Sequence, residues 1–558
     1  MVVAVVVGLA LRALHWWSAT GSPPRTVLLT NAARYDAWAQ RITGGNPPLP
    51  PFDQPPLYPY LLAATYTLAG HKPEWMLAVQ AVADALGCGL IAWMAGRCFG
   101  QRAAWAAGLL AAVFGPFIYH TAELLPATFG LALLVAGAAC ALANGPVTAG
   151  LAFATATLMR PESVLAALLV ACWAWGRGQR RLSAGIVGAA VAALVGGSVA
   201  VSLVAGRPLP YSTGFGLNLW LGNNPSADGV SPFIPRAQEG FAERVRFEAG
   251  GDAWAADGRF AAHALRFWRE LPGAALQLAV KKLRWTLVDP ELPNTSALDW
   301  QLSYSAVFAW PLFPLSFGAV WVLACAGAVL LGRKSLAPWP LWAVALATVA
   351  VCTVFFTNAR FRLPLAPLLL VLAGGGVAEI AGLLQERRRT EVVGRRLLLA
   401  GAAALAGAVV AFSNPYRVRD YRIAALDANA GIAERLAGHP ARAVEYLRRA
   451  LAQEAGDEIA WVHLVLAQEQ QGDVRGALQS LLDAAERLAE APDLEQLAAS
   501  FFTRHGLRLE LWQEYRTSTQ RGAREVLRRE LYQRLGAGSP GIRPPAAPAP
   551  VDSAPQKP

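Results

Sequence analysis

The chain has 558 residues, of which 55% are apolar and only 16% are charged, and its mean hydropathy is +0.34. These values exclude an ordinary soluble domain and predict a protein that crosses a membrane several times. The formal net charge of +11 belongs to that topology, as the loops show, and predicts no nucleic-acid partner.

Eleven apolar runs predict membrane helices, because most approach the roughly 20 residues that a helix needs to cross a ~30 Å hydrocarbon core. They are residues 1–17, 76–96, 103–119, 124–143, 147–159, 163–176, 183–205, 305–331, 338–356, 363–384 and 397–413. The shorter run 57–70 lies between prolines, and we expect it to form a helix at the membrane interface.

Basic residues in the short loops predict the orientation. If the N-terminus is cytoplasmic, the inner loops hold twelve of them, namely Arg97, Arg102, Arg177, Arg180, Arg181, Arg333, Lys334, Arg387, Arg388, Arg389, Arg395 and Arg396. The loops 18–75 and 206–304 and everything after about residue 414 then lie on the outer side. We therefore expect a multi-pass protein of the cytoplasmic membrane with its C-terminal part outside.

The sequence offers no strong sign of a cofactor. All six cysteines lie in or at the ends of apolar runs, which predicts neither disulfides nor a cysteine metal site. No metal-ligand cluster, phosphate-binding glycine loop or nucleophilic serine is recognisable. No cofactor is certain, and a divalent cation is the one candidate.

The first outer loop carries two motifs, Y-D-x-W-A-x-x-I-x-x-G from Tyr35 and P-P-L-Y-P-x-L-L-A from Pro55. Together they resemble the first extracytoplasmic loop of glycosyltransferase family 39, the protein O-mannosyltransferase-like enzymes. The resemblance implies an all-α membrane bundle of the GT-C type over residues 1–415. It also implies a polyprenyl-phosphate sugar as donor and transfer with inversion.

The same loop holds the first candidate site residues. Asp36 and Asp53 are candidate bases for deprotonating an acceptor hydroxyl, and Tyr58 is a candidate substrate contact. The family usually has an acidic residue where this chain has Asn31, and an amide cannot act as a base. Three outcomes stay open: Asp36 takes over the role, Asn31 orients the acceptor, or catalysis is lost. A helix cap or solvated residue at Asp36 and a turn residue at Asp53 are the structural alternatives.

Four further residues are predicted at the bilayer edge. Glu123 lies in a very short outer loop, where the resemblance implies a second acidic residue. Arg160 lies between two short apolar runs, and we expect it in a recessed cavity, with pairing to Glu162 as the alternative. Arg360 and Arg362 belong to an R-x-R-L-P-x-x-P segment that resembles the same bacterial family. They are candidate phosphate ligands, and lipid headgroups are the alternative.

The long outer loop contains Asn218-Leu-Trp-Leu-Gly222-Asn223-Asn224-Pro225, which resembles an N-x-x-x-G-N-N-P stretch of the same proteins. Asn223 and Asn224 are candidate sugar contacts. A plain Gly-Asn-Asn-Pro turn explains them equally well.

The C-terminal third is richer in Ala, Glu, Arg and Leu. Gly438, Ala443 and Ala450 recur 34 residues later as Gly472, Ala477 and Ala484, which is the tetratricopeptide period. We expect tetratricopeptide-like helical repeats over 420–536, with 486–536 capping the array, and a disordered Pro/Ala-rich tail over 537–558. Such arrays bind other chains, so a protein partner is predicted here.

The leading hypothesis is a membrane glycosyltransferase that moves a sugar from a polyprenyl-phosphate donor to an outer-face acceptor, whether protein, lipid or glycan. The alternative is a catalytically inactive transferase-like scaffold that recruits envelope-assembly partners through its repeats. A transporter is a weaker hypothesis, because the polar residues gather on one face. The sequence identifies neither the sugar nor the acceptor.

Overall fold

The structure is a computed structural model, and it describes all residues except 235–237, 294–296, 311–314, 386–390, 490 and 538–558. Secondary structure in the described residues is helical, apart from an isolated bridge between Phe114 and Leu315. The chain divides into two compact units, Met1–Tyr421 and Arg422–Pro558. The predicted all-α fold is confirmed. Arg387, Arg388, Arg389 and the tail from 538 onward lie outside the described residues.

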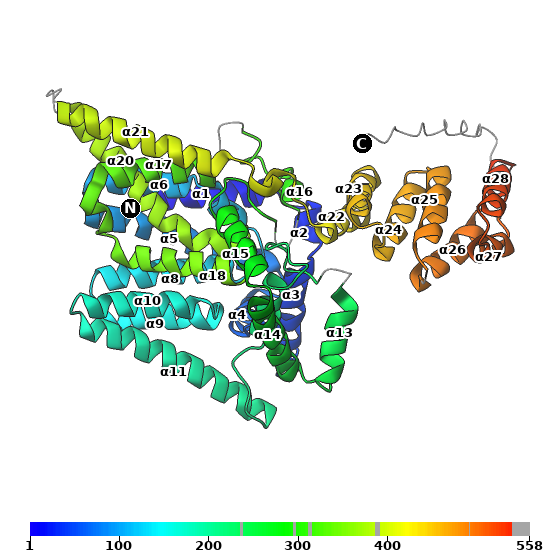
Figure 1. The fold of residues 1–558 in the computed structure, drawn as a ribbon, viewed down its shortest axis with the longest axis horizontal. Helices are drawn as coiled ribbons and strands as arrows, with labels where there is room; N and C mark the ends of the chain where they lie inside the picture. Colours follow the sequence, from blue (N-terminus) through cyan, green and yellow to red (C-terminus); the bar gives the residue numbers. More distant parts are fainter. Residues whose placement is uncertain (235–237, 294–296, 311–314, 386–390, 490, 538–558) are drawn as a thin grey trace. The chain divides into compact units, whose positions relative to one another are not determined.

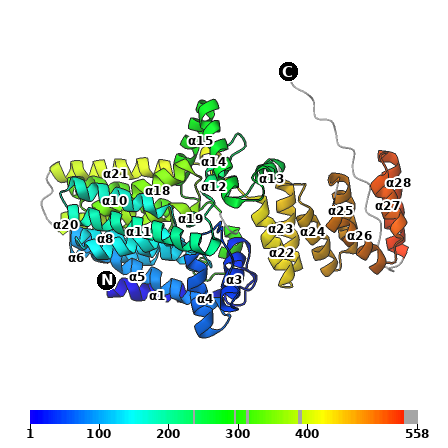
Figure 2. The same cartoon turned by 90° about the horizontal axis from the view of Figure 1, so that it is seen from below.

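Every predicted apolar run contains a helix of the first unit. These helices are α1 (Val2–Ser18), α5 (Pro73–Phe99), α6 (Gln101–Ala112), α7 (Gly115–His120), α8 (Ala127–Leu142), α9 (Pro146–Met159), α10 (Ser163–Gly176), α11 (Arg180–Ala205), α17 (Phe317–Leu331), α18 (Trp339–Val354), α20 (Ala366–Gln385) and α21 (Glu391–Phe412). Figure 1 shows α8, α9 and α10 side by side, and α17 packs against both α20 and α21, which Figure 2 shows at the edge of the same bundle.

Helix length separates full crossings from shorter elements. Among the described residues, five helices are long and apolar enough to cross a membrane, or six if α1 and Pro23–Thr43, bent by 97°, form one broken span. The apolar helices α8, α9, α10 and α18 have only 14 to 16 residues. At 1.5 Å per residue they reach about 21–24 Å, less than the hydrocarbon core. The multi-pass prediction is confirmed, and among the described residues five or six of the eleven predicted spans are long enough to cross the membrane alone.

Two predicted runs differ in detail from the helices. The run 103–119 breaks between α6 and α7, where Leu315 accepts a hydrogen bond from Gly115 N (2.9 Å) and donates one to the Val113 carbonyl (3.0 Å). In the run 305–331, α17 begins at Phe317, and the side chain of the preceding Ser316 caps it by accepting a hydrogen bond from Ala319 N. Hydropathy locates apolar residues and does not report such breaks.

Both outer loops are folded into helices. The first contains α2 (Pro23–Thr26), α3 (Thr30–Thr43) and α4 (Leu57–Ala69), and the last of these matches the helix predicted over 57–70. The second contains α12 (Phe215–Gly222), α13 (Glu239–Glu248), α14 (Ala253–Glu270), α15 (Pro272–Thr286) and α16 (Leu298–Leu302), while α19 (Ala359–Arg362) precedes α20. These helices carry most of the predicted site residues.

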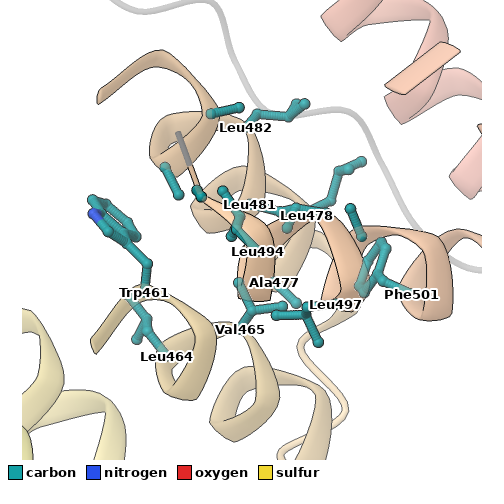
Figure 3. Close-up of a cluster of buried hydrophobic side chains, with 14 of the residues drawn as sticks. Trp461, Leu464, Val465, Ala477, Leu478, Leu481, Leu482, Leu494, Leu497 and Phe501 are labelled. Carbon is teal, nitrogen blue, oxygen red and sulfur yellow. The ribbon is translucent and has the colours of Figure 1, made fainter. Parts of the chain in front are cut away.

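The second unit consists of α22 (Ala424–Leu436), α23 (Pro440–Gln453), α24 (Glu458–Gln470), α25 (Val474–Arg487), α26 (Pro492–Arg504), α27 (Leu509–Thr517) and α28 (Arg521–Ala537). The first six form three consecutive helical hairpins. Figure 3 shows how side chains of α24, α25 and α26, among them Leu464, Leu481 and Phe501, pack into one apolar core. A helical repeat is therefore present, and its tetratricopeptide identity stays a prediction.

Candidate active site

A cavity of about 500 Å³ lies in the first unit and contains both of the leading acidic candidates. Asp36 of α3 and Glu123, from the segment between α7 and α8, line it together. The remaining wall comes from the end of α1, from α2, from the start of α5 and from α16. Its lining residues include Trp16, Arg25, Ala32, His71, Glu74, Leu77, Trp300 and Gln301. The fold thus joins two carboxylates that are 87 positions apart in sequence (123 − 36).

Asp36 is held by three neighbours. Asp36 is 8% exposed and lies in the middle of α3, so it is neither a helix cap nor a solvated residue. The Tyr66 hydroxyl donates to Oδ1, His71 Nε2 lies 2.8 Å from the same oxygen, and Gln40 Nε2 donates to Oδ2 at 2.6 Å. These contacts fix the carboxylate while leaving it on the cavity wall.

Glu123 is equally enclosed, at 7% exposure. His120 Nδ1 lies 2.6 Å from Oε2, and the Tyr119 hydroxyl lies 3.3 Å from Oε1. The backbone carbonyl of Glu123 accepts a hydrogen bond from Gln80 Nε2 at 2.8 Å. Beside it, Arg25 donates to the Ala122 carbonyl at 2.7 Å and lies within electrostatic reach of the Glu123 carboxylate. One wall of the cavity therefore pairs an acid with a cation.

The other first-loop candidates lie outside this cavity wall. Asn31 is half-buried in the first turn of α3. Asp53 is 41% exposed and forms an ion pair with Arg34. Tyr58 is fully buried and donates its hydroxyl to Gln80 Oε1 at 2.8 Å. Tyr58 thus supports Gln80, which in turn holds the backbone at Glu123.

Arg160 and Arg360 converge on one aromatic ring. The Arg160 guanidinium lies 5.2 Å and that of Arg360 5.1 Å from the centre of the Phe361 ring. Arg160 is paired with Glu162 at 2.6 Å, as the structural alternative expected. For Arg360 the described residues provide no ion pair, and its buried Nε has no hydrogen-bond partner. Arg360 also lies within electrostatic range of Arg160, Glu123 and Glu162. Two neighbouring cations with one carboxylate partner suit an additional anion.

Three other candidates use their polar groups within the protein. Arg362 donates to the carbonyls of Val288, Asp289 and Pro290 and pairs with Glu291 at 2.8 Å. Asn223 bonds the carbonyls of Leu219 and Val354 and accepts from Trp268 Nε1 and Lys282 Nζ, both at 3.0 Å. Asn224 accepts from Ser226 N and Gln238 Nε2. These contacts support structural roles, so the predicted phosphate and sugar contacts gain no geometric support.

Sequence reasoning missed Arg25, Tyr66, His71 and His120 as neighbours of the two acids. His71 was visible only as the end of an apolar run, and no spacing rule joins it to a residue 35 positions earlier. It also missed the buried ion pair of Arg12 with Asp84, whose Nε–Oδ2 distance is 2.6 Å, although two charges inside apolar runs are a usable signal. Within the described residues, no group of three or more His, Cys, Asp or Glu side chains could hold a metal ion.

Residues 53–203 match the family model of the dolichyl-phosphate-mannose-protein mannosyltransferases. No curated protein gives a match. Among solved structures, the crystal structure of ArnT from Cupriavidus metallidurans bound to undecaprenyl phosphate is similar, with 16% identity, 90% coverage of this chain, 85% coverage of that chain and a TM-score of 0.40. The match confirms the family resemblance over residues 53–203: this part of the multi-pass membrane protein is similar to the mannosyltransferase-like membrane glycosyltransferases.

Proposed function

We propose that the protein transfers a sugar from a polyprenyl phosphate to the hydroxyl of an acceptor at the outer face, with inversion at the sugar. The supporting observation is the cavity that Asp36 and Glu123 both line, with Glu123 in electrostatic reach of Arg360. The matched family takes its name from dolichyl-phosphate-mannose, which is a polyprenyl-phosphate sugar. That name supports the proposed donor class.

Each residue has a definite role in this proposal. Glu123 accepts the proton of the acceptor hydroxyl, since Arg25 and Arg360 lie within its electrostatic reach and favour the ionised carboxylate that can act as a base. Asp36 anchors the acceptor in the cavity. Arg360, assisted by Arg160, stabilises the departing polyprenyl phosphate, where a preorganised cation lowers the energy of developing negative charge. Any divalent cation would add to this charge stabilisation.

The decisive experiment measures sugar transfer in membranes supplied with polyprenyl-phosphate sugars. Glu123→Gln should lower the rate about 10²-fold or more, because a positioned base contributes roughly that much, and Asp36→Asn should also lower transfer sharply. Membrane yield and donor binding should be kept in both variants. Asp53→Asn is the matched control, since this carboxylate is half-exposed and paired with Arg34. Near-wild-type transfer in both cavity variants would exclude the proposed site.

The alternative is an inactive scaffold, and Asn31 is the observation that favours it. Restoring the family residue by Asn31→Asp separates the two. If wild-type protein transfers sugar, the scaffold is excluded. If neither the wild-type protein nor Asn31→Asp transfers sugar, and both still bind the donor, the scaffold hypothesis is preferred to the enzyme hypothesis.

Orientation belongs to the proposal as well. We place the protein in the cytoplasmic membrane with the cavity and the helical repeats outside. A reporter that is active only in the cytoplasm should give signal when inserted at Lys334 and none when fused after Ala537. Signal at the second position would reverse the topology.

A further inference from the structure

We propose that His120 is a positioning residue for Glu123: its Nδ1–H holds Oε2 and so fixes the carboxylate, whose Oε1, also in contact with the Tyr119 hydroxyl, accepts the proton of the acceptor hydroxyl. The inference rests on the proposed function and adds a residue to it. His120 Nδ1 lies 2.6 Å from Glu123 Oε2, and both residues are less than 8% exposed. A carboxylate only accepts hydrogen bonds, so Nδ1 carries the hydrogen when Glu123 is ionised.

The far side of the imidazole supports a fixed tautomer. Among the described residues, His120 Nε2 has no hydrogen-bond partner, although it is buried. The hydrogen on Nδ1 is therefore the one that can hold Glu123, because Oε2 is the described hydrogen-bond partner of the ring.

The ring is also fixed by its surroundings. It packs edge-on against Tyr119, with 4.8 Å between ring centres, and the His120 carbonyl accepts a hydrogen bond from Thr128 Oγ1 at 3.0 Å. Every residue of α7, which ends at His120, is buried. A side chain held in this way can orient a carboxylate without contacting the substrate.

Several charged groups face the pair and set its electrostatics. Arg25 and Arg360 favour the ionised carboxylate, while Asp84, which is paired with Arg12, lies in electrostatic reach of His120. The Tyr119 hydroxyl contacts Oε1, and the other ionisable side chains that line the cavity include Asp36, His71 and Glu74. None of these groups replaces the direct donor on Oε2, so removal of His120 should make Glu123 easier to protonate.

The test follows the protonation of Glu123 and the pH profile of transfer in the full-length protein. Infrared difference spectra against Glu123→Gln identify the carboxyl band. In His120→Phe, which keeps a ring and removes the donor, protonation and the acidic limb of the pH–rate profile should move up by about one pH unit or more. In His120→Asn, whose amide can supply a donor near the Nδ1 position, both should stay near the wild-type pH.

His15 provides a matched control. It is buried, its Nε2 also has no partner, and its Nδ1 contacts Ser305 Oγ at 2.6 Å and no carboxylate. His15→Phe should leave the acidic limb unmoved. A wild-type titration in His120→Phe, or an equal shift in His15→Phe, would overturn the inference. Should wild-type protein transfer no sugar, the proposed function fails, yet the infrared titration still decides whether His120 holds Glu123.

A measurement on unaltered His120 covers the case in which His120→Phe does not fold. In protein with ¹⁵N-labelled histidine, the Nδ1–H resonance of His120 should report a strong hydrogen bond and should shift when Glu123 is changed to Gln. An unchanged resonance would contradict the direct contact and with it the inference.

Discussion

Two arginines that are two positions apart in one motif have different surroundings, and this difference can be measured. Arg360 has no ion pair among the described residues, whereas Arg362 binds three carbonyls and Glu291. We expect Arg360→Gln to weaken donor binding at least about tenfold with normal membrane yield, because a cation on a phosphate contributes through a charge-assisted contact. Arg362→Gln should lower yield and thermal stability, since breaking a buried ion pair costs about 3–5 kcal/mol. The reverse assignment would contradict the site.

Lys282 makes the stability of the first unit depend on pH. Its Nζ is buried and donates to Asn223 Oδ1 and to the Phe355 carbonyl at 3.0 and 2.8 Å. Burial lowers the pKa of Lys282 to about 7. An unfolded lysine titrates near pH 10.4, so between about pH 7 and pH 10 the unfolded chain binds more protons and stability rises with pH. Below pH 7 both states are protonated, and this contribution no longer changes.

Thermal unfolding in detergent across that pH range checks the effect. Lys282→Met should remove a slope of at most about 1.4 kcal/mol per pH unit. The exposed Lys334→Met serves as the control and should keep the wild-type slope. Equal slopes in all three proteins would show that Lys282 titrates as it does in water.

At the scale of helices, close packing between α17 and α20 depends on glycine. A Cβ added to Gly376 would lie 2.5 Å from Gly327 Cα, which is backbone and cannot rotate away. We therefore expect Gly376→Ala to lower the free energy of unfolding by about 1–3 kcal/mol through overpacking. Gly382 lies in the same helix, and a Cβ added there would meet no atom within 4 Å. Gly382→Ala should be neutral or slightly stabilising. A thermal shift assay of the two variants therefore separates the steric effect of the added methyl group from its effect on helix propensity.

The sequence predicted the helices well, because hydropathy is a local property of each run. It predicted the two short runs on either side of Arg160, which are α9 and α10, but not the break at Phe114, because that break depends on Leu315, far along the chain. At the site, the sequence motifs selected Asp36 and Glu123, and both line the cavity. The sequence could not show that Arg362 and Asn223 donate to backbone carbonyls from other parts of the chain, and these contacts favour structural roles for both. Contacts over long sequence distances decide those roles.

The repeat unit also contains more than its sequence pattern predicts. Two repeats were predicted, and the structure contains a third hairpin formed by α26 and α27. Gly438, Gly472 and Gly506 all have positive φ, and each turn closes with a backbone bond over five residues: His439 to Glu434, Asp473 to Gln468 and Leu507 to Phe502. This is the Schellman helix ending, for which glycine is favoured. Gly506 lies at the 34-residue offset from Gly472. The position that is Ala443 in the first repeat and Ala477 in the second is Leu511 in the third, so the small-residue pattern alone does not identify this repeat.

At the scale of the whole molecule, the two units should separate at Tyr421. The segment before the boundary belongs to the first unit, because Trp285 Nε1 donates to the Pro415 carbonyl at 2.9 Å and the Tyr421 hydroxyl donates to Asp228 Oδ2 at 2.5 Å. Val418 is buried in the same cluster. A chain ending at Tyr421 should therefore fold, whereas one ending before Pro415 should lose yield and thermal stability.

The shortened chain also tests what the helical repeats contribute. Donor binding should persist without residues 422–558, because Arg160, Arg360, Asp36 and Glu123 all lie in the first unit. If the repeats recruit the acceptor, use of the natural acceptor should fall about tenfold or more, as expected when a tethered site no longer raises its local concentration. A small soluble acceptor analogue should be used at the wild-type rate. Loss of donor binding in the chain ending at Tyr421, with its fold intact, would show instead that the repeats form part of the site itself.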